Sequence, residues 1–591
     1  MMKGLFSVIQ SVFMIVGLAW NARAAQQTIT VPLRFDHYYT YEMVVEALQA
    51  LHRKYPDKTR LDLVGRSEEG REIYCMTVNN PATGEPLSKP GIYVDGNIHG
   101  NEIQAGEVAL YLLDYLLGQY DINVEIKDLV DRKCFYVVPV VNVDGRHHFF
   151  ADPGTSSSNR GLRIPTDDDH DGLIDEDFPD DLDGDGNICQ MRIKDPFGTY
   201  KSDPQDKRLM VRIKPGEQGE WRLLGFEGID NDGDGRINED EEGYVDPNRN
   251  WGYGWMPPYV QSGAGNFPFS SKGMKALADF ISARPNICVG WAFHNTGGMF
   301  LRGPSTQSQG EYDPKDIAVY DYLGNQAERI TPGYRYLVSW QDLYETHGDF
   351  SEWMAMIMGA YTFVGELYRV EDETFATARE KEQNPEPPGG GGNFFHRNIR
   401  LDRERLLFND HLVHGRLYKE WHAYRHPVYG EIEIGGWTKM STRLPDPFML
   451  LDQVHRNAAA VIFSARQSPD VRLEVFENEK IGANLVRLRV RLINTGAIPT
   501  MSYHAQKVNL YPRDMLQVSG PGLRVVAGGK IKNVFEDQVE YKRYRPELQF
   551  LFVPGFGKVE YQFLIHGDGQ AIVLYQSRHA GSLQKHVRIK S

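Results

Sequence analysis

Residues 91–102 read GIYVDGNIHGNE and combine a strand pattern with two potential metal ligands. The apolar run at 92–94 predicts a buried strand, and Asp-Gly-Asn predicts the turn that ends it. His99 and Glu102 follow this turn, three residues apart. An imidazole and a carboxylate so placed can bind zinc at about 2.0–2.2 Å. Because two ligands do not complete a catalytic site, a third ligand, a base and substrate-binding groups are expected elsewhere.

Length and charge narrow the class of protein. The chain has 591 residues, of which 41% are hydrophobic and 12% aromatic, so it can bury a large core and is expected to form two to four domains. The net charge of -15 argues against nucleic acid or an anionic membrane as the main partner.

The N-terminal residues 1–24 have the pattern of an export signal. Lys3 precedes an apolar run at 5–20, and Ala22-Arg23-Ala24 is a cleavage signature. An uncleaved membrane anchor is the alternative, but the run is short for a span. We expect a secreted or periplasmic protein without a transmembrane segment after cleavage. Cys134 and Cys288 lie in buried-strand patterns that favour free thiols, and disulfide pairing stays open.

The pattern of apolar residues predicts an α/β fold with a mixed twisted sheet flanked by helices. Continuous apolar runs at 134–141, 286–295 and 360–368 alternate with helical spacing at 39–53, 107–117 and 445–466. Residues 61–64 and 72–78 alternate like the strands of a hairpin, and 134–142 is expected to be a strand that ends at Asn142. Residues 371–430 are polar and predicted to be irregular, with a mobile PPGGGG stretch at 387–392. From 470 to 591, alternating strands predict a separate β-sandwich.

An acidic insertion at 151–245 interrupts this rhythm and carries three calcium-type loops. Carboxylates at positions 1, 3, 5 and 12 with Gly at position 6 are the calcium-loop pattern. The third loop is complete, whereas the first two lack the twelfth-position Glu. An acidic, solvated, flexible insertion is the alternative. The candidate calcium ligands are Asp167, Asp169 and Asp171; Asp181, Asp183 and Asp185; and Asp230, Asp232, Asp234 and Glu241.

Two further strand ends supply the parts that His99 and Glu102 lack. His294 closes the strand at 286–295, and Glu366 closes the strand at 360–368. Functional groups gather at the carboxyl ends of neighbouring strands in open sheets. Zinc bound by His99, Glu102 and His294 would leave one position for water, and Glu366 could take a proton from that water.

A carboxylate-binding motif lies between these strands. Residues 246–251 read DPNRNW, in which the planar guanidinium of Arg249 suits bidentate binding of a carboxylate and Asn248 adds a donor. A zinc site beside such a clamp indicates cleavage next to a free C-terminus.

Taken in order, these motifs resemble the zinc metallocarboxypeptidases of the carboxypeptidase A-like (funnelin) family. The resemblance covers about residues 35–466 and is that of an exported, bacterial-type member with a calcium-loop insertion. GNIHGNE, AFHN, FVGEL and DPNRNW match family motifs, and VVPVVNVDG matches one in which Val143 replaces a proline. The resemblance implies zinc-dependent hydrolysis of the C-terminal bond of peptides or proteins.

The same resemblance assigns two more residues. The spacing of Tyr344 before Glu352-Trp353 and Glu366 implies that Tyr344 covers the substrate near its terminal carboxylate. Arg160-Gly-Leu-Arg163 implies that Arg160 polarises the scissile carbonyl. Ser351 stands where basic-specific members carry an acid, which favours a neutral or broad preference, although Asp349 is close by. The C-terminal domain is expected to be transthyretin-like or immunoglobulin-like, and the oligomeric state is open.

Two other functions compete with this interpretation. A related zinc amidase or peptidase could act on cell-wall peptides, but such relatives tend to lose the Asn-Arg pair that Asn248-Arg249 retains. A calcium-dependent surface binding protein with an inactive peptidase fold is the second. The joint presence of His99, Glu102, His294 and Glu366 argues against an inactive site.

Overall fold

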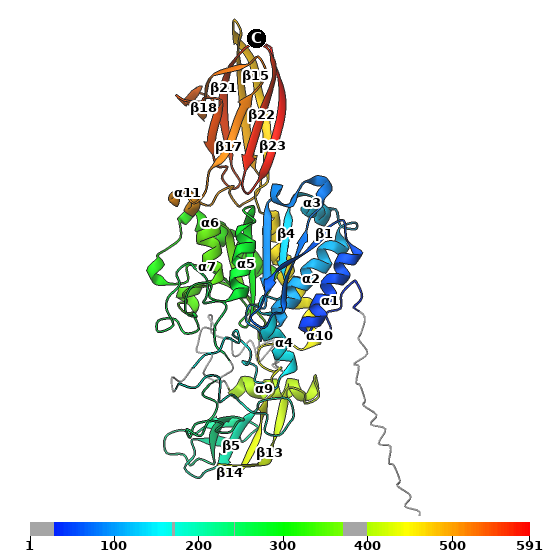
Figure 1. The fold of residues 1–591 in the computed structure, drawn as a ribbon, viewed down its shortest axis with the longest axis vertical. Coiled ribbons are helices and arrows are strands. Elements are labelled where there is room, and N and C mark those ends of the chain that lie inside the picture. The colour runs from blue at the N-terminus through cyan, green and yellow to red at the C-terminus, as the bar shows by residue number, and fades with distance from the viewer. Residues whose placement is uncertain (1–28, 168–171, 241–242, 370–398, 591) are drawn as a thin grey trace, which may run out of the picture.

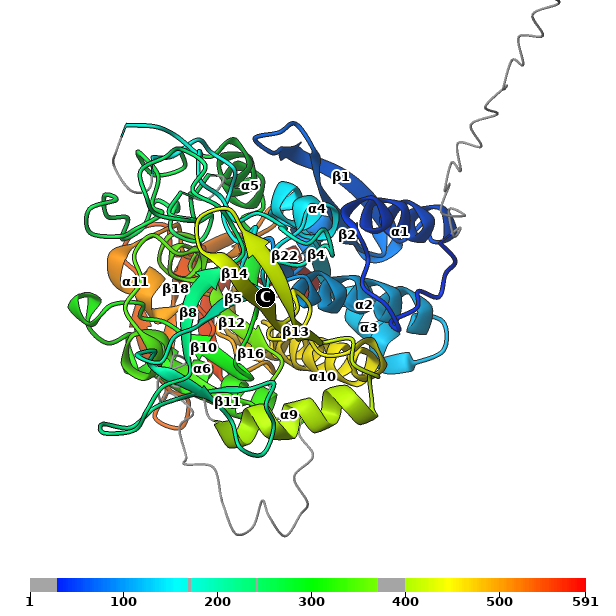
Figure 2. The ribbon, with the colours of Figure 1, turned by 90° about the horizontal axis from the view of Figure 1, so that it is seen from below.

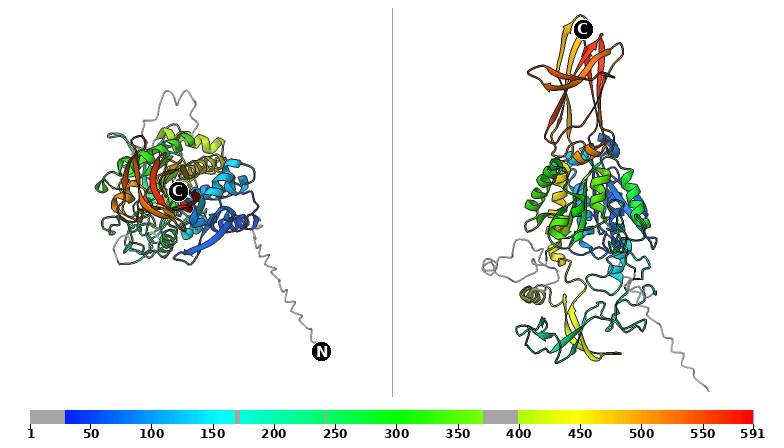
Figure 3. Two further views of the ribbon diagram at one scale, coloured as in Figure 1. Left: turned by 90° about the horizontal axis from the view of Figure 1, so that it is seen from above. Right: turned by 90° about the vertical axis from the view of Figure 1, so that its left-hand side faces the viewer.

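The computed structural model describes residues 29–167, 172–240, 243–369 and 399–590. The predicted signal segment 1–24, the PPGGGG stretch and Asp169, Asp171 and Glu241 lie outside these residues. Three parts follow one another along the long axis of the molecule: a small sheet with one helix at one end, an α/β part in the middle, and a β-sandwich at the other end (Figure 1 and Figure 3).

The middle part is built on an eight-stranded mixed sheet. β3 pairs in parallel with β4 and β9, β9 pairs in parallel with β12, and β1, β2 and β4 pair antiparallel in that order. The strand order is β1 (Thr59–Arg66), β2 (Glu72–Val78), β4 (Cys134–Val138), β3 (Gly91–Gly96), β9 (Ile287–Asn295), β12 (Tyr361–Leu367), β10 (Met299–Arg302) and β11 (Arg335–Val338). The predicted mixed sheet is confirmed, as are the hairpin and the three apolar strands.

Helices pack against this sheet. The burial of α2 and the N-terminal cap of α10 show how the sequence determines two of them. α2 is buried over most of its length and packs beside α10, as Figure 2 shows. α10 begins where Asp446 caps the helix and Pro447 occupies its first turn, a position that tolerates proline. The helices of this part are α1 (Tyr41–Lys54), α2 (Gln104–Gln119), α3 (Val124–Arg132), α4 (Val143–Ala151), α5 (Lys272–Ser282), α6 (Pro314–Ile330), α7 (Phe350–Trp353) and α10 (Pro447–Arg466).

The strand that was expected to end at Asn142 stops earlier. β4 ends at Val138, immediately before Pro139, which has no N–H to donate to a sheet ladder. Asn142 instead caps α4, with its side chain accepting a hydrogen bond from the Gly145 N–H at 2.8 Å. The apolar run alone therefore predicts a longer strand than the one that forms.

The acidic insertion forms a second sheet together with residues that were predicted to be irregular. That prediction was wrong from residue 399 onward, where α9 (Ile399–His411) and β13 form. Their apolar pattern is weak because ion pairs such as Arg403 with Asp203 contribute to the packing. The sheet order is β13 (Tyr418–His426), β14 (Gly430–Trp437), β5 (Gln190–Lys194), β8 (Trp221–Phe226), β6 (Tyr200–Ser202) and β7 (Met210–Arg212).

The C-terminal part is the predicted β-sandwich with its own core. A short helix, α11 (Tyr503–Val508), lies against α6, where Asp316 accepts hydrogen bonds from the backbone N–H groups of Tyr503 and His504 at 3.0 and 2.8 Å. One sheet holds β15 (Val471–Gly482), β16 (Leu485–Asn494), β21 (Lys558–His566), β18 (Arg524–Asn533) and β19 (Gln538–Tyr541); the other holds β20 (Leu548–Leu551), β17 (Asp514–Ser519), β22 (Gly569–Ser577) and β23 (Gly581–Ile589).

Two expectations about covalent and membrane features can be compared with the fold. All four cysteines are buried and free, including Cys134 and Cys288. Across the described residues, no helix combines the length and apolar character needed to cross a bilayer.

Candidate active site

Three neighbouring strands bring the predicted residues to one edge of the sheet. His99 and Glu102 follow β3, His294 lies near the end of β9, and Glu366 lies near the end of β12. β3 pairs with β9, and Glu366 is in register with His294 on β9. Because these strands are parallel, their carboxyl ends lie at the same edge of the sheet. The four predicted residues therefore converge there.

The turn between His99 and Glu102 depends on its glycine and its asparagine. A Cβ on Gly100 would lie 2.3 Å from the Asn159 carbonyl oxygen and 2.4 Å from Gly145 Cα, so no side chain fits there. The Asn97 side chain donates to the carbonyls of His99 and Gly100 at 2.6 and 3.0 Å. The backbone of the turn is therefore held before any ligand binds.

His99, Glu102 and His294 each direct one ligand atom to the same point. The Nδ1 atoms of the two histidines lie 3.1 Å apart. Glu102 Oε1 lies 3.0 Å from His99 Nδ1, and Oε2 lies 2.9 Å from His294 Nδ1. All three side chains are buried. Two imidazole nitrogens and a carboxylate oxygen are a donor set of catalytic zinc sites, and this spacing suits one ion bound at about 2.0–2.2 Å from each ligand.

Asp246 fixes the orientation of His99. Its Oδ1 lies 3.0 Å from His99 Nε2 and also accepts the Asn248 backbone N–H at 2.7 Å. Such a carboxylate on the far ring nitrogen sets which nitrogen faces a metal. Although burial opposes it, the charges of His99 and Arg249 hold the pKa of Asp246 well below its usual range. Sequence reasoning gave Asp246 no role; its place two residues before Asn248 was the available signal.

Arg160 lies beside the same cluster, at the start of the insertion. Its Nη1 donates to Glu102 Oε1 at 2.7 Å, and its Nη2 lies 3.1 Å from His99 Nε2. Its carbonyl accepts the Gly100 N–H at 3.0 Å. Although burial opposes it, the charges of His99 and Arg160 hold the pKa of Glu102 well below its usual range. The ligand carboxylate is therefore ionised.

Glu366 is the carboxyl group of the site with a raised pKa. Burial raises the pKa of Glu366 to about 7, and the largest charge effects on it are those of His294, which lowers this pKa, and Glu102, which raises it. A carboxyl group with a pKa near the working pH can both accept and return a proton. Arg443, from the loop before α10, also acts on Glu366, and no sequence motif pointed to it.

Asn248 and Arg249 lie between the ligand cluster and α7. Asn248 Oδ1 accepts the Phe350 N–H at 2.9 Å, and Arg249 Nη1 donates to the Asn248 carbonyl at 2.8 Å. Arg249 has an exposed fraction of only 7%, yet no carboxylate in the described part of the chain forms an ion pair with it. A buried guanidinium with free donors can take a carboxylate from a ligand.

Tyr344 completes the set of predicted active-site residues. It is 53% exposed. Partial burial of the hydroxyl nevertheless raises its pKa, and the charges acting on it include those of Arg249, Glu366 and Arg160. The hydroxyl therefore lies within electrostatic reach of both the candidate base and the candidate clamp.

The acidic loops gather carboxylates, but not in one uniform way. Asp181, Asp183 and Asp185 place ligand oxygens within 4.8 Å of one another, and Lys419 and His422 pair with two of them. In the third loop, Asp232 and Asp234 group with Glu239 among the described residues. Asp167 is described without its partners, because Asp169, Asp171 and Glu241 lie outside the described residues.

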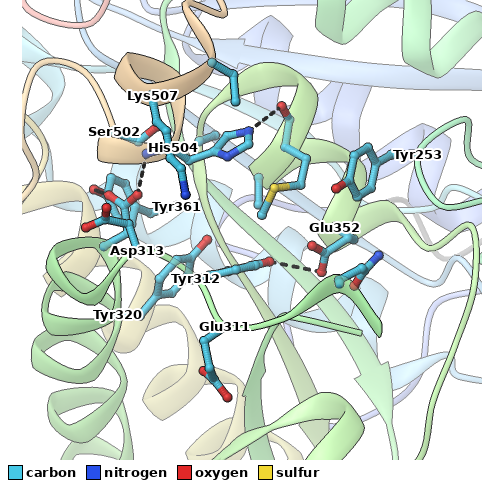
Figure 4. Close-up of a pocket in the computed structure, with 16 residues that line it drawn as sticks. Tyr253, Glu311, Tyr312, Asp313, Tyr320, Glu352, Tyr361, Ser502, His504 and Lys507 are labelled. Carbon is cyan, nitrogen blue, oxygen red and sulfur yellow. Dashed lines mark hydrogen bonds between the residues drawn. The ribbon is translucent and has the colours of Figure 1, made fainter. Parts of the chain in front are cut away.

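A separate cavity of about 270 Å³ lies where α6 and α7 meet α11 (Figure 4). None of the predicted site residues lines it. Glu352 lies on its wall and accepts a hydrogen bond from the Tyr312 hydroxyl at 3.0 Å. Burial, followed by the charge of Asp349, raises the pKa of Glu352 to about 8. The cavity is thus distinct from the ligand cluster.

Comparisons with protein families find two matches along the chain. A model described as zinc carboxypeptidase matches residues 44–186 and 225–384. A model of a domain of unknown function matches residues 470–588.

Known proteins resemble parts of the chain. Carboxypeptidase D of Homo sapiens is 36% identical over 115 residues, which are 19% of this chain and 8% of that protein. The carboxypeptidase N catalytic chain of Rattus norvegicus is 36% identical over 116 residues, which are 19% of this chain and 25% of that one. The match spans a quarter or less of each relative. The crystal structure of carboxypeptidase A from Helicoverpa armigera has 18% identity and a TM-score of 0.41, covering 75% of this chain and 78% of that one.

Proposed function

The chain belongs to the zinc carboxypeptidase family, and we propose that it hydrolyses the last peptide bond of peptides or proteins with a free C-terminus. The observation that carries this proposal is the convergence, at the same sheet edge, of one ligand cluster, one high-pKa carboxyl group and one buried guanidinium that forms no ion pair with the described carboxylates. The first supports metal binding, the second proton transfer, and the third recognition of the chain end.

His99, Glu102 and His294 would hold the zinc ion, with Asp246 orienting His99. Zinc, when bound, supplies a Lewis acid and makes water acidic enough to react near neutral pH. Glu366 would accept the proton from the attacking water and then donate it to the departing amine nitrogen. Its raised pKa supports this double role, because the carboxylate of a stronger acid would be too weak a base to take the proton from water.

Asn248 and Arg249 would bind the terminal carboxylate of the substrate, with Tyr344 above it. The bidentate geometry of a guanidinium explains why an ionised chain end would be preferred over an amide. Arg160 would polarise the scissile carbonyl and stabilise the negative charge that develops on its oxygen. For that, Arg160 has to exchange part of its contact with Glu102 for the substrate.

The remaining assignments concern the rest of the molecule. We propose a catalytic domain at 35–466, supported by its continuous core, and a β-sandwich domain at 470–591, supported by a separate core. The family match breaks between 186 and 225, which supports an insertion within 151–245. We further propose that the acidic loops bind structural calcium and that the protein is exported through residues 1–24.

The test is hydrolysis of matched peptides that differ only at the C-terminus. The purified protein is incubated with peptides bearing a free or an amidated C-terminus, with and without a zinc chelator, beside Glu366→Gln. We expect release of single C-terminal residues from the free peptides, loss of activity with chelator and recovery with zinc. The variant should lose at least about 100-fold in kcat, the scale of a positioned acid–base group. Internal cleavage, or activity that survives complete zinc removal, would refute the proposal.

A further inference from the structure

The acidic insertion contains a buried carboxylate that the calcium-loop pattern leaves unexplained. Asp177 has an exposed fraction of 0%. Its Oδ1 accepts a hydrogen bond from Asn231 Nδ2 at 3.1 Å, but its Oδ2 meets no donor in the described part of the chain. An ionised group buried without a partner is costly, whereas a bound cation would satisfy it.

The neighbours of Asp177 are other carboxylates. Asp177, Asp230 and Asp232 bring ligand oxygens within 4.8 Å of one another, and Asp232 belongs to an overlapping group with Asp234 and Glu239. Glu239 Oε2 also meets no donor among the described residues. Like charges held this closely repel unless a cation lies between them.

Among the described residues, basic side chains relieve little of this repulsion: Arg236 Nε lies 3.6 Å from Asp234 Oδ2 at the edge of the group. The neighbouring loop pairs Asp185 with Lys419 at 2.9 Å and Asp183 with His422 at 3.0 Å. By contrast, no lysine or arginine of the described residues forms an ion pair with Asp177, Asp230 or Asp232. The second loop is partly neutralised by the protein itself, whereas Asp177, Asp230 and Asp232 have no such partner among the described residues.

The position of Asp177 follows from a repeat in the sequence. Residues 167–177 (DDDHDGLIDED) and 230–240 (DNDGDGRINED) share the same residue at seven positions. The last residue of each repeat reaches the other repeat: Asp177 joins Asp230 and Asp232, and Asp240 Oδ2 accepts the Asp175 N–H at 3.1 Å. The ninth residues, Asp175 and Asn238, have φ values of 53° and 63° in the left-handed region, which turn the chain toward its partner.

We propose that Asp177, Asp230, Asp232 and Glu239 bind one calcium ion that is shared between the two repeats. The ligands are oxygens only and come from two chain segments, which suits the large and flexible coordination shell of calcium better than the compact, water-keeping shell of magnesium. This inference rests on the proposal that the insertion binds calcium. It adds that one ion bridges two segments and that Asp177, which occupies none of the ligand positions of the calcium-loop pattern, is a ligand.

A bridging ion would also fix the two ends of the insertion. The ends are joined by the hydrogen bond from the Leu162 N–H to the Val245 carbonyl at 2.8 Å, and by that from the Gly243 N–H to Asp175 Oδ1 at 2.9 Å. Arg160 precedes this junction and Asp246 follows it, and both contact the ligand cluster. The shared ion thus connects the fold of the insertion to the active site.

The experiment counts calcium ions and measures melting temperature in the zinc-loaded, full-length protein. Calcium chloride is titrated by calorimetry into wild type, Asp177→Asn, Glu239→Gln and Asp203→Asn. We expect both Asp177→Asn and Glu239→Gln to bind one calcium ion fewer, or to bind it at least tenfold more weakly. Without calcium, Asp177→Asn should melt no lower than wild type, because it removes an uncompensated charge.

Asp203→Asn is the matched control, because Asp203 is an equally buried aspartate of the insertion that has an arginine partner. It should melt lower than wild type with or without calcium and keep the full number of ions. If wild type binds no calcium, the calcium proposal itself fails. If wild type binds calcium and Asp177→Asn binds the same number with the same affinity, only the shared site is overturned. Magnesium binding as tightly as calcium would overturn the choice of ion.

Discussion

At the scale of single residues, the metal-ligand cluster depends on residues that would not bind the metal themselves but hold its ligands in position. Asp246 bonds to His99 Nε2 at 3.0 Å, and Asn97 donates hydrogen bonds to the His99 and Gly100 carbonyls within the turn. A histidine whose far nitrogen is unconstrained can rotate or change tautomer, which weakens its bond to a metal. Residues of this kind carry part of the metal affinity although they bind no metal.

We predict that Asp246→Asn lowers zinc affinity about 10- to 100-fold, the usual range for such an outer partner. Competition with a chromogenic zinc chelator measures the change. Asp144→Asn is the control, since Asp144 is equally buried but bonds to Ser67 and Arg71. Equal zinc affinities in wild type and Asp246→Asn would contradict the role of Asp246.

A second residue-level prediction concerns Asp95, which lies buried in β3. Burial raises the pKa of Asp95 to about 8, above the value of about 3.9 in an unfolded chain. Between these values the folded state binds the extra proton, so the unfolding free energy falls as pH rises from about 4 to about 8. Asp95→Asn should therefore stabilise the protein more at pH 8 than at pH 5. Denaturant unfolding at the two pH values measures this, and an equal effect at both would contradict it.

How much could be predicted from the sequence also differs from residue to residue. His99, Glu102, His294 and Glu366 were recognisable because each sits at the end of an apolar run, where the position in the strand fixes the position in space. Asp246 and Asp177 were missed because their partners are distant in sequence, and burial is not visible in a local pattern.

At the scale of elements, the insertion is held by strands and a helix from another part of the chain. β5 pairs with β14, and Arg403 on α9 binds Asp203 through two short hydrogen bonds of 2.5 and 2.6 Å. α9 and β13 escaped prediction because their sequences are polar and their packing relies on such ion pairs. Asn142 shows the opposite error, since an apolar run continued past the proline that ends β4.

We predict that Asp203→Asn destabilises the insertion by about 1–3 kcal/mol, less than the loss of a fully buried pair because Arg403 is partly exposed. Limited proteolysis should then cut residues 151–245 faster than in wild type, and mass spectrometry of the fragments locates the cuts. Arg400→Gln is a suitable control, because Arg400 lies on the same helix without contacting Asp203 in the described structure. Unchanged cutting in Asp203→Asn would show that α9 does not hold the insertion.

At the scale of the whole molecule, the β-sandwich meets the α/β part through polar contacts at several points, among them that of Arg578 Nε with the Pro285 carbonyl. Asp316 on α6 accepts the N–H groups of Tyr503 and His504 and the Tyr361 hydroxyl, and Arg132 pairs with Asp470. The junction also encloses the cavity of Figure 4, so the two parts do not pack fully there.

We predict that Asp316→Ala costs about 1–3 kcal/mol, because it leaves buried donors unsatisfied. Calorimetry should show the α/β part and the sandwich melting further apart than in wild type. Asp313→Ala, at the N-cap of the same helix, removes one hydrogen bond to the Lys315 N–H and should change the stability by less. A single unchanged transition in Asp316→Ala would mean that the sandwich does not depend on this contact.

The central claim for the molecule is that Arg249 binds the terminal carboxylate of the substrate and so places the last peptide bond at the zinc site. The most direct measurement is kcat/KM for one peptide in its free-acid and amidated forms, with wild type and Arg249→Gln. We expect wild type to prefer the free acid by at least about 100-fold in kcat/KM. The amidated peptide cannot form the charge-assisted hydrogen bonds with Arg249, and their loss costs about 3 kcal/mol. Arg249→Gln should lose most of that preference while retaining zinc. Equal cleavage of both peptides by wild type, or an unchanged preference in the variant, would contradict the account.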